Sequence, residues 1–414
     1  MKKLYMLAAV SALCLASSQG FAAGYQLNEY SMTGLGRAFA GAGVVGDDFS
    51  ALAYNPAGMV LNKTSGVQGG LSVAHLNAKV RGEQNGEYAK TKMNIGVALP
   101  HAFGQYKVND RLTAGFGVYA PFGLRTRYSK QSFVAEAGVR SELEVIDLAP
   151  AVAYRVTDKL SLGASVIARY IHGRMTNNLP ATMMGQIPMG GYSDFDLDGW
   201  TAAWSIGAMY EFTPNTRIGV SFKGKSMQTV KGSHKVTGSK LPVNQDLTNG
   251  EASPDLPASL LVSGYHKVNE KWGLAASVRW TDWKDSFQEF SLISPDAKIL
   301  VPYGGKKTVD EKWRETWTIS FGADYYLNEN WTLRAGVAYD QSPVRNKYHR
   351  TIRIPDSNRT WVSLGASYKT KNWQFDAGYA HLFMKNGTSQ YTGDVKAHFK
   401  SYSNLIGLQA QYKF

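Results

Sequence analysis

The chain has 414 residues, a formal net charge of +13 at neutral pH and 12% aromatic residues. The excess of basic over acidic residues is not accompanied by a nucleic-acid recognition motif, so it does not indicate a nucleic-acid partner. The only cysteine is Cys14, near the N-terminus, so we expect no disulfide framework and no thiolate metal site in the rest of the chain. We expect no metal and no cofactor.

Residues 1–22 have the features of a secretory signal peptide. Lys2 and Lys3 precede an apolar run over residues 4–16, and the small residues Gly20 and Ala22 place the cleavage after Ala22. A membrane anchor would need about 20 apolar residues, which is more than this run provides. Removal of the leader would lower the charge from +13 to +11.

Residues 23–62 form a second region, rich in Gly and Ala and without the alternation of a β-strand. It ends near Asn55-Pro56-Ala57, where we expect a rigid turn, because Pro56 fixes its own φ and restricts the residue before it. Asn55 is expected to hydrogen-bond to nearby backbone, as Asx residues do in turns. Such a compact segment of small side chains needs a place within the structure that follows.

Residues 63–414 alternate apolar and polar side chains and contain no run of 18 apolar residues, which excludes a helical membrane protein. Short Asn-, Asp- or Pro-containing turns are expected at six places. Longer polar stretches lie between them. The turns are at residues 108–111, 156–159, 213–216, 268–271, 327–330 and 369–372, and the long stretches are near 81–90, 129–138, 177–196, 231–255, 287–311, 343–357 and 386–401.

Short turns at one end and long loops at the other are typical of an outer-membrane barrel, whose strands are even in number. The turns predict an all-β, antiparallel transmembrane barrel of about 14 strands. One misread hairpin would give 12 or 16. Because such a barrel is too wide to be filled by its own side chains, residues 23–62 are expected to lie in its lumen as a hatch, with Gly24, Tyr25 and the Asn55-Pro56-Ala57 turn as gate residues.

The alternation predicts which side chains face the lipid. Trp313, Glu315 and every second residue to Tyr325 are expected to face outward, and Arg314 inward. Over residues 333–340, the odd-numbered residues are expected outward and the even-numbered ones inward. The chain ends on alternating residues and a terminal Phe414, which is typical of the last strand of an outer-membrane barrel and of recognition by the barrel assembly machinery.

Three prolines fall inside adjacent predicted strands, at Pro100, Pro121 and Pro150. Proline lacks the N–H that a β-ladder needs, so these positions predict either three separate bulges or a local break in the wall. Gly123 lies in the same stretch. We expect a lateral opening here.

A loop over residues 175–189 is rich in methionine, which gives an adaptable apolar surface. It contains Met183, Met184, Ile187 and Met189. The loop is expected either to capture apolar ligands or simply to cover the barrel, and we favour capture.

Several motifs resemble the FadL family of outer-membrane transporters. They are Gly24-Tyr25-Gln26-Leu27-Asn28-Glu29-Tyr30-Ser31, Gly34-Leu35-Gly36-Arg37-Ala38-Phe39, Asp47-Asp48, Asn55-Pro56-Ala57, Val118-Tyr119-Ala120-Pro121-Phe122-Gly123, Tyr210-Glu211-Phe212-Thr213-Pro214-Asn215-Thr216-Arg217, Leu256-Pro257-Ala258-Ser259, Trp280-Thr281-Asp282-Trp283, Asp340-Gln341-Ser342-Pro343-Val344 and Ile354-Pro355-Asp356. The resemblance covers the whole chain after the leader. It implies a 14-stranded barrel with an N-terminal hatch and a kink in the third strand that opens beside the hatch.

The resemblance further implies uptake of long-chain fatty acids or, as in some relatives, of aromatic hydrocarbons. A carboxylated ligand would need a cation. Arg314 aligns approximately with a basic residue of the family's high-affinity pocket, and Arg174 and Arg279 are further candidates. The implied surroundings are outer-membrane lipid and lipopolysaccharide of a Gram-negative bacterium, and we expect a monomer.

Two other classes remain as alternatives. A general porin would have an open, conducting lumen without a hatch. An outer-membrane lipid hydrolase would need a nucleophilic site, but the eight histidines are scattered and there is no G-x-S-x-G motif. We therefore expect a transporter and not an enzyme.

Overall fold

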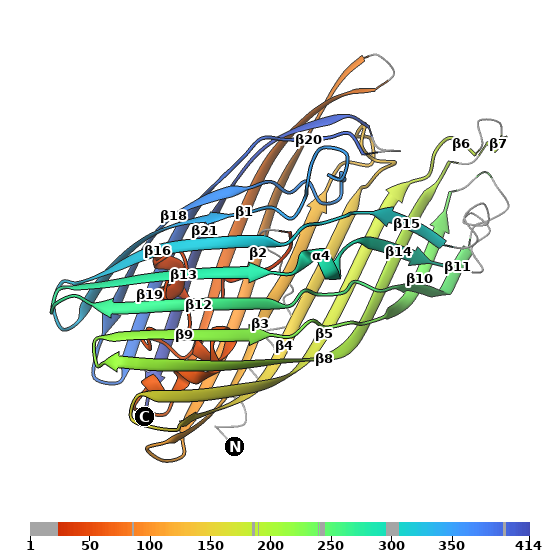
Figure 1. Ribbon diagram of the computed structural model, residues 1–414. Helices are drawn as coiled ribbons and strands as arrows, with labels where there is room; N and C mark the ends of the chain where they lie inside the picture. Colours follow the sequence, from red (N-terminus) through yellow and green to blue (C-terminus); the bar gives the residue numbers. More distant parts are fainter. Residues whose placement is uncertain are drawn as a thin grey trace.

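The computed structural model describes residues 24–84, 87–183, 187–188, 190–238, 240, 245–294, 306–391 and 395–414. The predicted leader, residues 1–22, lies outside these ranges. Within them, the chain forms a long barrel of tilted strands, with the segment before the first strand in its interior (Figure 1).

Fourteen strands of the described residues pair antiparallel in a ring that closes where Gly66 of β1 lies opposite Lys413 of β21. This confirms the predicted fold class and strand number. In order around the ring, they are β1 (Gly66–Gln84), β2 (Glu87–Lys107), β3 (Leu112–Arg127), β4 (Arg140–Arg155), β5 (Leu160–Asn178), β8 (Tyr192–Thr213), β9 (Thr216–Lys223), β12 (Ser259–Lys267), β13 (Trp272–Thr281), β16 (Thr316–Tyr326), β17 (Trp331–Asp340), β18 (Arg359–Lys369), β19 (Trp373–Met384) and β21 (Ala397–Lys413).

Shorter elements extend the ring at the end with the long loops. A second tier continues outward from β8 and consists of β10 (Val230–Thr237), β11 (Gln245–Ala252), β14 (Glu289–Ile293) and β15 (Lys306–Asp310). The remaining elements are β6 (Thr182–Met183), β7 (Ile187–Pro188), β20 (Gly387–Ser389) and the helical turns α2 (Met32–Gly36), α3 (Ala51–Tyr54), η1 (Pro56–Leu61) and α4 (Trp283–Ser286). No helix in the described ranges is long and apolar enough to cross a membrane.

All six predicted short turns join consecutive strands of the ring, at the end where both β1 begins and β21 ends (Figure 1). The predicted long loops are partly wrong. Residues 81–90 mostly continue β1 and β2, and the stretches near 231–255 and 287–311 contain the second-tier strands. Polar composition misled the prediction there, because strands that extend beyond a membrane no longer need an apolar face.

The predicted alternation is confirmed in β17, where Leu333, Val337 and Tyr339 are exposed on the outside, while Arg334 and Asp340 are buried in the lumen. In β16 it holds throughout the strand, and Glu315, just before the strand, is also exposed as predicted.

The outward placement of Trp313 is wrong, since its side chain is 0% exposed and packs inside the barrel. The strand parity does not extend back to Trp313 because β16 begins at Thr316 and Lys312 has a positive φ of 45°.

Residues 24–62, called the N-terminal segment below, lie inside the barrel. The turn α2 contacts β17, β18, β19 and β21, while η1 contacts β3, β4, β5, β8 and β9, so the segment reaches opposite walls of the ring. Most of its apolar side chains, among them Leu27, Met32, Leu35, Phe49 and Met59, are almost fully buried. The tight packing needs glycines on the wall, where Gly163 and Gly207 leave room for the backbone of η1 and for Asn55.

Candidate functional site at a break in the barrel wall

The pairing between β2 and β3 stops part of the way along the strands. The last paired residues are Ala102 and Val118, whereas β2 continues to pair with β1, and β3 with β4. Pro100 lies just beyond this point on β2, and Pro121 lies just beyond it on β3, where the register with β4 shifts. Because proline cannot donate to a ladder, the two residues mark a stretch of wall in which β2 and β3 share no registered pairs.

The third proline does not contribute to this break. Pro150 pairs with Phe116 of β3. Ala149 and Pro150 form no registered pair with β5, but the register of β4 with β5 is the same at Leu148 and at Ala151. The hydroxyl of Ser165 donates to the carbonyl oxygen of Pro150 at 2.8 Å. The prediction of an opening at Pro150 is therefore wrong, since the strand tolerates the missing N–H without losing alignment.

The N-terminal segment occupies the edge of β3 that β2 leaves unpaired. Gln26 forms an antiparallel bridge with Phe122. The N–H of Leu27 donates to the carbonyl oxygen of Pro121, and the N–H of Gly123 donates to that of Tyr25, both at 2.8 Å. The segment thus replaces β2 as the hydrogen-bonding neighbour of β3 at this level.

Next to this bridge, the ring of Tyr25 is enclosed by four aromatic side chains. The centroid distances are 6.1 Å to Phe122, 4.6 Å to Trp283, 5.5 Å to Phe287 and 5.5 Å to Trp313. All five are buried. The Tyr25 hydroxyl and the Trp283 indole N–H have no hydrogen-bond partner among the described residues, so the cluster contains two unused polar groups.

Gly24 is required by the geometry of the same cluster. Its φ is +66°, and a side chain would meet Trp283 and Trp313 at 2.9 Å. Its N–H donates to Asp356 Oδ2 at 3.0 Å, which attaches the start of the segment to the loop after β17. The sequence pointed to Gly24 and Tyr25 but missed their aromatic partners. Trp283 belongs to one of the family-like motifs, and that was the available signal.

The three cationic candidates differ in their partners. Arg174 forms an ion pair with Asp194 at 2.7 Å, so its charge is already neutralised. Arg314 precedes β16 and donates to the carbonyl oxygen of Ser342, at 3.2 Å from Nε. Arg279 faces the lumen from β13 and donates to the side chain of Asn28. In the described part of the chain, no ion pair is formed by Arg314 or Arg279.

Lys223 is a further lumen cation that the sequence reasoning missed. Lys223 is the last residue of β9 and pairs with Ser259 of β12, whereas Arg279 of β13 pairs with Leu261 of β12. The two cations therefore lie on opposite sides of β12, at nearly the same level. Its ammonium is 3.4 Å from the carbonyl oxygen of Ala53 and 5.4 Å from the centroid of the Tyr119 ring. The inward parity of β9 could have identified it.

The Asn55-Pro56-Ala57 turn is fixed to the wall. The Asn55 side chain accepts from the N–H of Ala57 at 3.1 Å, which confirms the predicted bond to nearby backbone. It also donates to the carbonyl oxygen of Ala208 at 3.1 Å, and more weakly to that of Val220 at 3.4 Å. Pro56 begins the turn of 3₁₀ helix η1.

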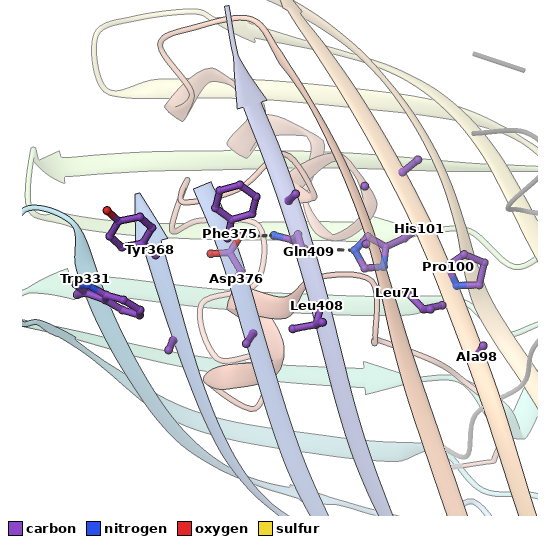
Figure 2. Close-up of a pocket in the computed structure, with 16 residues that line it drawn as sticks. Leu71, Ala98, Pro100, His101, Trp331, Tyr368, Phe375, Asp376, Leu408 and Gln409 are labelled. Atoms are coloured by element: carbon purple, nitrogen blue, oxygen red, sulfur yellow. Dashed lines mark hydrogen bonds between the residues drawn. The ribbon is translucent and has the colours of Figure 1, made fainter. Parts of the chain in front are cut away.

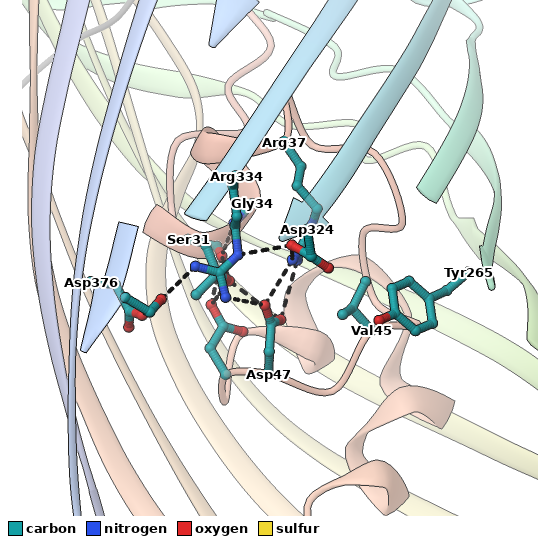
Figure 3. A network of polar contacts seen from close by, with 12 residues as sticks. Ser31, Gly34, Arg37, Val45, Asp47, Tyr265, Asp324, Arg334 and Asp376 are labelled. Atoms are coloured by element: carbon teal, nitrogen blue, oxygen red, sulfur yellow. Dashed lines mark hydrogen bonds and ion pairs between the residues drawn. The ribbon is translucent and has the colours of Figure 1, made fainter. Parts of the chain in front are cut away.

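A four-charge network forms a second attachment (Figure 3). Arg37 pairs with Asp47 of the same segment and with Asp324 of β16, both at 2.8 Å. Arg334 of β17 pairs with Asp47 at 3.0 Å and with Asp324 at 3.1 Å. Burial alone would raise the pKa of Asp47, but the guanidinium groups of Arg37 and Arg334 outweigh it and hold that pKa well below its usual range.

A buried carboxyl lies between these attachments. Glu29 is 2% exposed and accepts a hydrogen bond from the N–H of Asn28 at 2.7 Å. Burial raises its pKa to about 7, and the backbone hydrogen bond and Arg359 oppose that rise. Glu29 is therefore a proton-binding group of the N-terminal segment near neutral pH.

The methionine-rich loop is described only in part. The short strands β6 and β7 form a hairpin in which Met183 pairs with Ile187. Met184 and Met189 lie outside the described residues. The loop extends from the end of β5, far from the short turns (Figure 1).

A groove of about 710 Å³ crosses the outside of the wall over β2, β1, β21, β19, β18 and β17 (Figure 2). Small residues such as Gly69 and Ala410 form its floor, and larger ones such as Leu71, Phe375 and Trp331 border it. His101, Gln409 and Asp376 form a hydrogen-bonded row on the lumen side of the same strands. The β2 end of the groove, at Pro100, adjoins the break.

Comparison with known proteins gives consistent results. The chain is 30% identical to outer membrane protein P1 of Haemophilus influenzae over the full length of both. It is 27% identical to a long-chain fatty acid transport protein of Escherichia coli O6:H1, covering 97% of each. The crystal structure of a Pseudomonas aeruginosa FadL homologue matches 95% of this chain and 100% of its own, with 26% identity and a TM-score of 0.84. A family model matches residues 13–414, and the chain therefore belongs to the outer membrane protein transport protein family (OMPP1/FadL/TodX).

Proposed function

We propose that this outer-membrane protein takes up long-chain fatty acids or similar hydrophobic molecules, and that residues 23–62 act as its hatch. The observation that carries the proposal is the bridge between Gln26 and Phe122. It closes the edge of β3 at one level of the stretch that β2 leaves unpaired. Detachment of Tyr25, Gln26 and Leu27 would therefore uncover a gap in the wall beside the lumen.

Lateral release has a physical basis. Each buried CH₂ group contributes about 0.8 kcal/mol, so a long acyl chain strongly resists transfer into periplasmic water. Exit between β2 and β3 would deliver the chain directly to the membrane. The apolar outer groove begins at Pro100, beside the break, and offers a continuous apolar path along the wall.

The apolar side chains that line the interior of the barrel favour an apolar substrate. On β1 and β2, the inward residues above the N-terminal segment include Leu76, Val80, Ile95 and Leu99, all buried in one apolar cluster. A porin surrounds its water-filled channel with polar side chains. This interior therefore favours a hydrophobic ligand over ions and small solutes.

For the ligand head group, we propose that Arg279 and Arg314 provide the positive charge, together with Lys223. A carboxylate would pair with such cations and could accept hydrogen bonds from the unused polar groups of Tyr25 and Trp283. The name of the Escherichia coli relative supports a fatty acid. The aromatic cluster around Tyr25 favours the second candidate, an aromatic hydrocarbon. The methionine-rich loop, with Met183, Met184, Ile187 and Met189, is proposed as the first capture surface.

Binding of oleate and of toluene to the purified protein tests the substrate class. We expect saturable oleate binding that weakens when the carboxylate is replaced by a methyl ester. Saturable toluene binding without oleate binding would instead favour the aromatic hydrocarbon. In planar bilayers we expect no large steady current, and such a current through the wild-type protein would overturn the hatch proposal.

A further inference from the structure

Three lysines lie side by side on the outer surface of the barrel. Lys79 of β1 is opposite Lys92 of β2 on one side and Lys400 of β21 on the other. All three side chains are exposed. Adjacent strands are about 4.8 Å apart, so three positive charges share one row across three strands.

The next outward row repeats the pattern. Arg81 of β1 lies opposite Lys90 of β2 and His398 of β21, and all three are exposed. The His398 ring is hydrogen-bonded to Thr388 at 3.0 Å. The two rows together form what we call the basic patch, defined by Lys79, Arg81, Lys90, Lys92 and Lys400.

Like charges directly opposite one another destabilise a sheet. The three strands contain only two carboxylates, Glu83 and Glu87, both at the tip of the β1–β2 hairpin. In the described ranges, no ion pair involves a residue of the basic patch. Elsewhere in the upper wall some cations are paired with carboxylates, as Arg125 is with Glu142 at 3.0 Å. The positive charges of the basic patch are thus not neutralised by carboxylates of the described residues.

The outward side chains of β1 indicate where the basic patch lies relative to the membrane. The outward face of β1 begins with the exposed apolar residues Val67, Leu71 and Val73. It then changes to His75, which is hydrogen-bonded to Asn94 of β2 at 2.6 Å. Lys79 follows four residues later, on the side away from the short turns. The basic patch therefore lies where the apolar membrane core gives way to the head groups of the outer leaflet.

We propose that the basic patch binds the phosphate groups of lipopolysaccharide in the outer leaflet. A phosphate monoester carries about −1.5 to −2 charges near neutral pH, so one group can compensate two neighbouring lysines. Surface clusters of lysine and arginine bind anionic lipid in this way. The site holds a glycolipid against β2, β1 and β21. Of these strands, β2 also forms one side of the break.

The test compares bisphosphorylated lipid A with its dephosphorylated form, using the full-length mature protein in detergent. The variant Lys79→Gln/Lys92→Gln/Lys400→Gln should bind bisphosphorylated lipid A roughly 10- to 100-fold more weakly than wild type. The matched control Lys63→Gln/Lys159→Gln/Lys371→Gln removes three exposed charges at the opposite end and should bind as wild type does. Equal binding of wild type and the patch variant would overturn the proposal.

Two further measurements separate the possible outcomes. The Lys79→Arg/Lys92→Arg/Lys400→Arg variant should retain binding, since the charges are kept. Inorganic phosphate at millimolar concentration should not displace lipid A, and displacement would contradict a lipid site. Heat-modifiable gel mobility reports barrel folding, and if the Gln variant does not fold, the Lys79→Gln single variant is measured in its place and should still bind more weakly than wild type.

Discussion

The backbone N–H of Leu27 donates to the carbonyl oxygen of Pro121, 2.8 Å away, at a level of the wall where β2 has stopped pairing with β3. The lumen segment and the wall are thereby joined by sheet hydrogen bonds, each worth only about 0.5–1.5 kcal/mol net. Hydrogen bonds of this strength can keep the gap closed, and they can also break while the barrel remains folded.

Replacing Asn55-Pro56-Ala57 with three glycines should impair uptake while the barrel still assembles. The substitution removes the rigid turn and the Asn55 bonds to Ala208 and Val220, so the N-terminal segment loses its hold on β8 and β9. Uptake of labelled oleate and heat-modifiable gel mobility measure the two effects separately. Uptake at the wild-type rate would count against a gating role for the turn.

Asp47→Asn should loosen the N-terminal segment by about 3–5 kcal/mol, because Arg37 and Arg334 remain buried with one carboxylate instead of two. Protease accessibility of the segment in increasing urea measures the change. The control is Asp110→Asn, which removes an ion pair with Lys107 in an exposed turn and should have no measurable effect. Similar behaviour of the two variants would show that the buried network does not retain the segment.

Glu29 should make the docking of the N-terminal segment pH-dependent. Its pKa of about 7 in the folded protein exceeds the ordinary value of 4.5 for a glutamate carboxyl, so the folded state binds the extra proton. The associated stability, about 3 kcal/mol, is complete below pH 4.5 and is lost as the pH rises to about 7. Protease protection of the segment should therefore be greater at pH 5 than at pH 8. Glu29→Gln should remove the difference, and an unchanged pH profile would refute the assignment.

Arg279→Ala should weaken oleate binding about ten-fold, since it removes a lumen cation that is not neutralised by a carboxylate. Arg174→Ala should change it little, because Arg174 is already paired with Asp194. Arg314→Ala tests Arg314, the first candidate from the sequence, separately from the two lumen cations Arg279 and Lys223. Tryptophan fluorescence titration measures all three, and equal affinity of Arg279→Ala and wild type would exclude Arg279 as the carboxylate partner.

The turns and the alternation predicted the ring of strands because both depend on local sequence. Tight turns need Asn, Asp or Pro, and a strand between lipid and lumen must alternate. The same reasoning failed at Trp313, where parity was carried past the start of β16. A side chain outside a strand has no parity.

The candidate site was only partly predictable for a similar reason. Pro100 and Pro121 indicated the break because proline acts on its own ladder, but Pro150 has the same chemistry and leaves the register intact. Whether a missing N–H opens a wall depends on the neighbouring strand. The bridge from Gln26 to Phe122 joins residues 96 positions apart, and no local pattern indicates it.

The most direct test of the account is a disulfide across that bridge, in the variant Gln26→Cys/Phe122→Cys. The bridge is of the non-hydrogen-bonded type, in which the Cα atoms lie about 4.5 Å apart, within the range that a disulfide spans. The only natural cysteine, Cys14, lies in the predicted leader. The oxidised variant should fold, bind oleate and fail to take it up, and reduction should restore uptake. Wild-type uptake by the fully oxidised variant would contradict release between β2 and β3.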